Sequence, residues 1–172
     1  MLKYVADVYG PPKDYYWGIG VALYFTLNKY QDQFVNGQWK TNNPNLTVDQ
    51  VLEGMDLSIK TYESQQKFAQ QLSHGSPYGL HLDAYELGVD TKGPFNIQAK
   101  KLASLDARIE ALMGRFVSAF FDQGGEQANW YSLGARSYDT QYGTWTVTNN
   151  PNNLNAAKER EFRVLRGLAP TV

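Results

Sequence analysis

The feature that most constrains the fold is a run of fourteen uncharged residues from Tyr15 to Asn28. This run, YYWGIGVALYFTLN, is rich in tyrosine and shorter than the about 17 to 25 apolar residues of a membrane-spanning helix. An apolar helix that does not cross a membrane has to be surrounded by protein. The run therefore predicts a helix that is apolar on most sides and continues through Tyr30 and Phe34.

The residues leave two interpretations of this predicted helix open. It is either the central core helix of the domain or a helix that contacts another subunit. Gly18 and Ala22 are four residues apart, so on a helix they would share a face and let another backbone approach closely. The candidate subunit-interface residues are Tyr15, Trp17, Gly18, Ala22 and Phe25.

Three further segments have the apolar spacing of helices. The second helix is expected to start at Thr47, because Thr47 and Gln50 fit a capping box. In the third, the spacing between apolar residues alternates between three and four, as in the seam of a coiled coil. The predicted helices cover residues 47–72, 102–120 and 154–166.

The remaining segments are expected to lack long helices. Gly10-Pro11-Pro12 favours an extended backbone, so residues 1–14 are interpreted as an extended N-terminal arm. Repeated glycine and proline predict an ordered loop at 73–94, with at most one helical turn at Asp83–Leu87. Residues 134–153 are predicted to be extended, with a short strand at Tyr142–Thr148.

Residues 37–46 resemble residues 143–154, since both contain Gly, Trp and Asn-Pro-Asn and both precede a predicted helix. Either good turn and cap residues are used twice, or the two segments pair as neighbouring extended strands; a short β-hairpin is thus left open in the fold. The length of 172 residues fits one domain. The predicted fold class is mainly α: a helical bundle of about four helices, with the arm at 1–14 and a single domain over 15–172.

The sequence contains no recognisable catalytic constellation. It has no cysteine, which excludes disulfides, thiolate metal sites and thiol nucleophiles. No G-x-S-x-G elbow and no phosphate-binding glycine loop are present. His74 and His81 could serve a small enzyme or, with Asp83 and Glu86, a metal site, or they could form only local hydrogen bonds. We predict a protein that is not an enzyme and has no metal, cofactor or small-molecule substrate.

Basic residues recur on the predicted helices. Lys101, Arg108 and Arg115 are seven residues apart, which puts them on one stripe about 21 Å long at 1.5 Å per residue. Evenly spaced cations beside small residues suit the phosphates of a polyanion. The alternative is that these cations are solvated or pair with neighbouring glutamates. The candidate nucleic-acid-binding residues are Lys60, Lys67, Lys100, Lys101, Arg108, Arg115, Arg160 and Arg163.

An arm with Gly-Pro-Pro, long helices with basic stripes, many tyrosines and no cysteine together resemble the major coat proteins of filamentous archaeal DNA viruses. The resemblance is one of architecture and covers roughly Tyr4 to Arg166. It implies paired helical subunits that wrap double-stranded DNA in an A-like form, with Lys100, Lys101, Arg108 and Arg115 facing phosphates. It also implies a virion location and, as partner, a second copy or a paralogous coat subunit.

Two functions are therefore expected. The first is a structural virion protein, a coat subunit that assembles into a filament and contacts DNA phosphates without sequence specificity. The alternative is a non-catalytic scaffold or adaptor subunit of a larger complex, such as a phage head–tail joint, with a cytoplasmic location. The net charge of −1 excludes a protein that holds nucleic acid by overall charge alone. No secretory signal and no membrane-spanning helix are expected.

Overall fold

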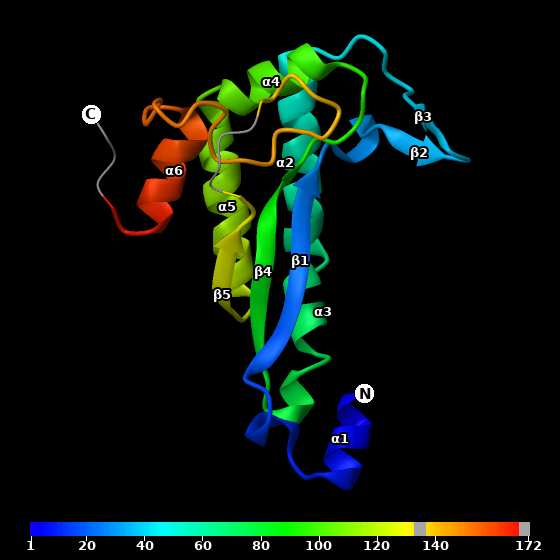
Figure 1. Cartoon of the computed structure of the whole chain (residues 1–172), viewed down its shortest axis with the longest axis vertical. Coiled ribbons are helices and arrows are strands. Elements are labelled where there is room, and N and C mark those ends of the chain that lie inside the picture. Colours follow the sequence, from blue (N-terminus) through cyan, green and yellow to red (C-terminus); the bar gives the residue numbers. More distant parts are fainter. Residues whose placement is uncertain (133–136, 169–172) are drawn as a thin grey trace.

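The computed structural model describes residues 1–132 and 137–168. Of these described residues 44% are helical and 19% lie in strands, so the protein is mixed α/β and the prediction of a mainly α bundle is wrong. Figure 1 shows an elongated molecule, in which the sheet extends from a broad end toward a narrow end that carries the N-terminus.

A parallel three-stranded sheet runs along the molecule in the order β1-β4-β5. In the β1–β4 ladder, Gly18 lies opposite His81 and Thr26 lies opposite Asp90. The strands are β1 (Gly18–Thr26), β4 (His81–Asp90) and β5 (Gly125–Trp130).

The uncharged run thus forms the edge strand β1 instead of the predicted helix over Tyr15–Phe34. Periodicity alone cannot distinguish a buried strand from a buried helix in a short apolar run. The two glycines in the run each cost a helix interior about 1 kcal/mol, whereas its aromatic and β-branched residues suit a strand. Successive side chains point to opposite faces of the sheet, so Phe25 is buried while Ala22 is exposed.

Helices cover one face of this sheet (Figure 1). The main two are α2 (Val48–Ser64) and α5 (Arg108–Asp122). Phe25 of β1 contacts Phe116 of α5 with ring centroids 5.0 Å apart, in a core built from aliphatic and aromatic side chains. In the described residues no helix lies over the other face of β1 and β4, whereas parallel sheets are usually covered on both faces.

The second predicted helix is confirmed at its start and divided near its end. The Gln50 amide donates to Thr47 Oγ1 over 3.2 Å, and the Thr47 amide donates to the Gln50 side chain over 3.0 Å, which completes the capping box. Gln66 takes a left-handed conformation with φ of 50°, so α2 ends at Ser64 and α3 (Lys67–Leu72) follows.

The third predicted helix is two helices, α4 (Ile97–Leu105) and α5. Asp106 is extended, with ψ of 138°, and interrupts the seam between them. Leu102 is consequently 54% exposed, and the buried seam begins at Ile109. The last predicted helix is confirmed as α6 (Ala157–Leu165).

The prediction of a loop at 73–94 is wrong, because this segment contains the central strand β4 after a short 3-10 turn, η3 (Ser76–Tyr78). The residues expected to form a helical turn, Asp83–Leu87, lie within that strand. Pairing on both sides stabilises β4, and its partners are about 40 and 60 residues away in the chain. Local sequence patterns do not report such pairing.

The short hairpin forms at a different place from the one suggested by the internal echo. Asn36 and Gly37 have φ of 51° and 78°, as in a type I′ turn, and join β2 (Gln33–Val35) to β3 (Gln38–Lys40). Before it lies the 3-10 turn η2 (Asn28–Tyr30). Because β3 pairs with β2, the suggested pairing of 37–46 with 143–154 is wrong.

The predicted extended segment 134–153 begins with residues, up to 136, that lie outside the described part of the chain. Described residues 137–153 contain no strand, so the predicted strand at Tyr142–Thr148 is wrong. Thr144 is nevertheless buried, with its Oγ1 2.6 Å from Ser104 Oγ of α4. In this segment, contacts between polar side chains take the place of the backbone hydrogen bonds between strands.

The N-terminal segment is not the uniformly extended arm predicted for residues 1–14. It consists of helix α1 (Leu2–Val8), a bend at Gly10-Pro11 and the 3-10 turn η1 (Pro12–Asp14). Pro12 is buried, which fixes this segment against the narrow end of the molecule.

Candidate functional site

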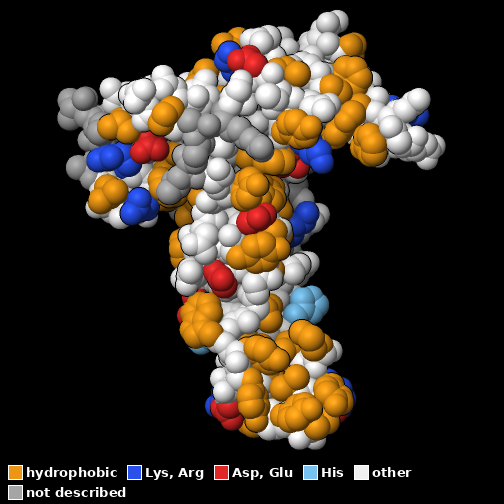
Figure 2. All heavy atoms as spheres, viewed as in Figure 1, with side chains coloured by type: hydrophobic (Ala, Val, Ile, Leu, Met, Phe, Trp, Pro, Cys, Tyr) orange, Lys and Arg blue, Asp and Glu red, His pale blue; other side chains and the backbone are white. Residues whose placement is uncertain are grey.

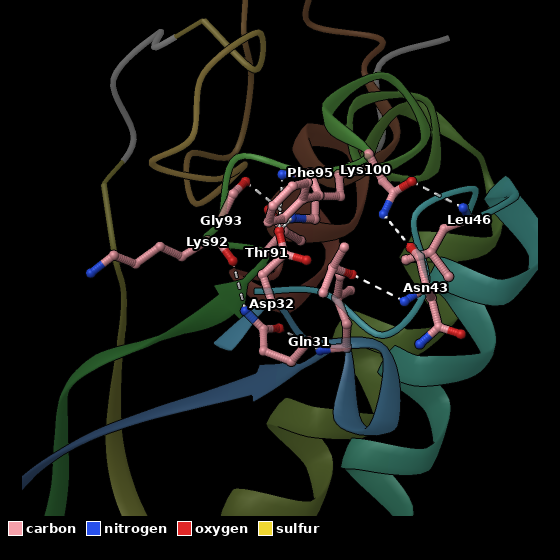
Figure 3. Close-up of polar contacts among 12 residues, drawn as sticks. Gln31, Asp32, Asn43, Leu46, Thr91, Lys92, Gly93, Phe95 and Lys100 are labelled. Atoms are coloured by element: carbon pink, nitrogen blue, oxygen red, sulfur yellow. Dashed lines mark hydrogen bonds and ion pairs between the residues drawn. The ribbon is translucent and has the colours of Figure 1, made fainter. Parts of the chain in front are cut away.

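Lys100, one of the predicted phosphate contacts, lies inside the protein. Its side chain is 2% exposed, and its Nζ donates to Asp32 Oδ2 over 2.8 Å and to the Gly93 carbonyl over 3.1 Å. Asp32 Oδ2 also accepts the Phe95 amide, and Figure 3 shows these groups pointing at one another. Burial lowers the pKa of Lys100, and the Asp32 carboxylate opposes that shift. Lys100 therefore anchors a loop and cannot reach a phosphate.

Arg108 and Arg115, the centre of the predicted basic stripe, are each paired with two acids. Arg108 lies 2.7 Å from both Asp106 and Asp49. Arg115 lies 2.6 Å from Asp56 and 2.7 Å from Glu63, both on helix α2. These hydrogen bonds raise the pKa of both guanidinium groups, and the contact with Arg108 lowers the pKa of Asp106 to about 2. The arginines connect α5 to the α2 side of the molecule.

Most other predicted phosphate contacts are also satisfied within the chain. Lys60 pairs with Asp56 at 2.6 Å, Lys101 with Asp139 at 2.7 Å, and Arg160 with Glu110. Lys67 places its amine 5.1 Å from the centre of the Tyr62 ring, and Arg163 also has an interaction within the chain. The cations of the stripe are therefore paired with acids, but mostly not with the expected neighbouring glutamates, and Arg160 with Glu110 is a pair of the expected kind.

The predicted interface residues lie in different environments. Tyr15 and Trp17 are exposed at the narrow end, and Ala22 is exposed on the open face of the sheet. Gly18 packs closely on β4, because a Cβ there would lie 2.8 Å from the His81 carbonyl oxygen. Phe25 is 0% exposed, so its side chain is packed in the protein's own core and is not available to a partner.

The narrow end carries a cluster of exposed aromatic and apolar side chains, which we call the aromatic end. Figure 2 shows it as a continuous hydrophobic area at the tip opposite the broad end. Each member is between 45% and 61% exposed. The aromatic end consists of Tyr4, Val8, Tyr9, Tyr15, Tyr16 and Trp17.

Local contacts hold these side chains in place. The Tyr15 hydroxyl donates to the Tyr9 carbonyl over 2.6 Å, and the rings of Tyr4 and Tyr9 meet edge to face at 6.1 Å. Trp17 stacks on the His81 ring with centroids 4.8 Å apart. A groove of about 540 Å³ adjoins this surface, lined by Ala6, Gly10, Pro11, Pro12, Lys13, Pro77, Tyr78 and Gly79. The rings therefore form an ordered surface beside a groove rich in proline.

The histidines are not arranged as a metal site. The His81 Nδ1 contacts the Glu126 carboxylate, and its ring lies under Trp17. His74 is exposed in the turn before η3. Within residues 1–132 and 137–168 no three His, Asp or Glu side chains come together in a way that could bind a metal ion. Nor does any helix there have the length and apolar character needed to cross a membrane.

The predicted interface residues include Tyr15 and Trp17 of the aromatic end but not Tyr4, Val8, Tyr9 or Tyr16. The first three of these lie in residues 1–14, which the sequence predicts to be an arm. The density of tyrosine in the first seventeen residues was the available signal, because exposed tyrosine is typical of protein contacts. Comparison of the chain with protein-family models, with curated proteins and with solved structures gave no match.

Proposed function

We propose that this protein is a non-catalytic scaffold subunit that associates with copies of itself through the aromatic end. The observation that carries this proposal is the gathering of six exposed aromatic and apolar side chains at one tip of the molecule. Large exposed apolar patches on a folded protein mark contact sites, and tyrosine and tryptophan are enriched in such contacts.

The charges around the aromatic end favour a second copy as the partner. Lys3 and Asp7 form an ion pair of 2.6 Å on α1, and Lys13 and Asp14 follow in η1. The surface therefore carries equal numbers of positive and negative side chains. Two copies can meet there without net repulsion, whereas a strongly charged partner would gain little.

The free edge of β1 continues from the aromatic end and supports the same proposal. No residue of this nine-residue strand is charged, and an uncharged free edge is a template for pairing with another strand. The Tyr24 carbonyl and the Thr26 amide on this edge are occupied by Tyr62 and Ser58 of α2. The direction of the backbone groups alternates along a strand. In the first half of β1, the amides and carbonyls of the small residues Gly18, Gly20 and Ala22 therefore point to the open edge.

Sedimentation velocity over a concentration series tests this function. We expect the sedimentation coefficient of the wild type to rise with concentration, because buried aromatic area stabilises the association. The double variant Tyr16→Ser, Trp17→Ser should remain a monomer. The matched control Phe34→Ser, Tyr142→Ser removes two exposed rings elsewhere and should associate like the wild type. A wild type that is monomeric throughout, or a Tyr16/Trp17 variant that associates normally, contradicts the proposal.

The coat-subunit prediction shares only the self-association with this proposal. DNA contact is predicted from the regular spacing of cations, and acids lie 2.6 to 2.8 Å from several of those cations. We therefore leave DNA contact and a virion location out of the proposed function.

A further inference from the structure

A cavity on the open face of the sheet lies near the carboxyl ends of β1 and β4. Its volume is about 240 Å³, and it is lined by Tyr24, Glu86, Asp90, Tyr131 and Trp145. Tyr24 comes from β1, and both acids come from β4. In open α/β sheets, ligands bind outside the carboxyl ends of the strands.

Three aromatic rings form the walls of this cavity. The Tyr24 and Tyr131 rings meet edge to face with centroids 6.1 Å apart, and Tyr131 meets Trp145 in the same way at 5.6 Å. Hydrogen bonds fix two of the rings. The Tyr24 hydroxyl donates to Glu86 Oε2 over 2.7 Å, and Trp145 Nε1 donates to Asp90 Oδ1 over 3.2 Å.

The two carboxylates give the cavity a negative charge, and no ion pair between described residues neutralises it. Neither Glu86 nor Asp90 forms an ion pair among the described residues. Of the described cations nearby, Lys92 places its amine over the Trp39 ring, and Lys100, which also feels the charge of Asp90, is paired with Asp32. An acidic, partly buried site of this kind is complementary to a cation.

Gly88 leaves room between the two acids. It lies midway between Glu86 and Asp90 on β4, so the three residues share one face of the strand. A Cβ at position 88 would come within 3.3 Å of Tyr24 Cε1. The absence of a side chain at position 88 therefore lets the Tyr24 ring lie close to the strand, beside both carboxylates.

We propose that this cavity binds the trimethylammonium group of a small molecule or lipid headgroup. Aromatic rings attract a cation through their negative faces, and several rings together are the usual receptor for alkylated ammonium ions. The volume is below the about 300 to 1,000 Å³ of pockets for drug-sized ligands, which restricts the occupant to a small group. A second hollow of about 200 Å³ shares Tyr131 and Trp145 and gives space for the remainder of the ligand.

Titration with choline and with its uncharged isostere, in which a tert-butyl group replaces trimethylammonium, tests the proposal on the wild-type protein. Binding is followed by calorimetry and by tryptophan fluorescence. We expect choline to bind at least about tenfold more tightly than the isostere, because the charge supplies the attraction. Equal binding of the two compounds, or binding of neither choline nor tetramethylammonium, overturns the proposal.

Variants locate the binding. Trp145→Leu and the nearly isosteric pair Glu86→Gln, Asp90→Asn should each weaken choline binding by about tenfold or more. Trp17→Leu and Glu53→Gln, which lie outside the cavity, should leave choline binding unchanged. Circular dichroism verifies that each variant is folded. Choline binding that survives both cavity changes in folded protein overturns the proposal.

Phosphatidylcholine vesicles distinguish the two sources of the ligand. Binding of free choline without vesicle binding assigns a soluble ligand, while vesicle binding that Trp145→Leu abolishes assigns a headgroup. Trp17→Ser is the control for vesicle contact through the aromatic end. This site is independent of the proposed self-association, so either proposal can fail alone.

Discussion

At the scale of single residues, the interior ion pair between Lys100 and Asp32 joins parts of the chain that are far apart in sequence. Lys100 lies on α4, and Asp32 lies between η2 and β2. Asp32 Oδ1 has no hydrogen-bond partner among the described residues, so its charge depends on Lys100 and on the Phe95 amide. Removing one member of a buried pair leaves the other charge without compensation.

Lys100→Met should therefore reduce the free energy of unfolding by about 3 to 5 kcal/mol, measured by urea denaturation. Lys101→Met is the matched control, since Lys101 pairs with the half-exposed Asp139. Lys101→Met should reduce the free energy of unfolding by less than about 1 kcal/mol. Equal losses in the two variants would show that Lys100 does not act as a buried structural charge.

Asp106 gives a prediction about pH. Hydrogen bonds from Arg108 hold the pKa of Asp106 at about 2 in the folded protein, below its ordinary value of 3.8. The unfolded chain therefore binds the proton more readily, and the contribution of Asp106 is lost as the pH falls from about 4 to about 2. The melting temperature of Asp106→Asn should fall less over this interval than that of the wild type. A parallel decline of both proteins would contradict this assignment.

At the scale of elements, the sequence predicts those features that depend on residues close together in the chain. The capping box at Thr47 and the apolar seam from Ile109 onward are both present in the structure. The strands β1 and β4 were not predicted, because a strand depends on partners that are distant in the chain. The run from Tyr15 to Asn28 was interpreted as a helix since its apolar character is continuous and has no alternation of period two.

Glycines in two helices test how α2 and α5 pack. A Cβ at Gly54 of α2 would lie 2.3 Å from the Leu27 carbonyl oxygen, whereas a Cβ at Gly114 of α5 would meet only the end of the Glu161 side chain. Gly54→Ala should therefore destabilise the protein by about 1 to 3 kcal/mol in denaturation experiments, despite the better helix propensity of alanine. Gly114→Ala should be neutral or stabilise by up to about 1 kcal/mol. The opposite order would exclude the close contact between α2 and the end of β1.

At the scale of the whole molecule, a sheet covered on one face separates the broad end from the aromatic end (Figure 1). The sequence left open whether the run with Tyr15 and Trp17 belongs to the core or contacts another subunit; both residues are exposed, whereas Phe25 of the same run is buried. The sequence could not place Tyr4 and Tyr9 beside the two exposed residues, because Gly10-Pro11-Pro12 favours an extended arm, whereas Gly10 takes a φ of 106° and the chain bends there. The basic stripe was predicted from spacing on one helix, and the acids that neutralise it come mostly from other elements.

Hydrogen–deuterium exchange of the wild-type protein at low and high concentration measures the central claim most directly. If the aromatic end is the contact between copies, amide exchange in residues 2–23 slows as concentration rises, while exchange in the hairpin at 33–40 does not change. Exchange that is independent of concentration in residues 2–23, or protection that develops at the hairpin instead, would contradict the account.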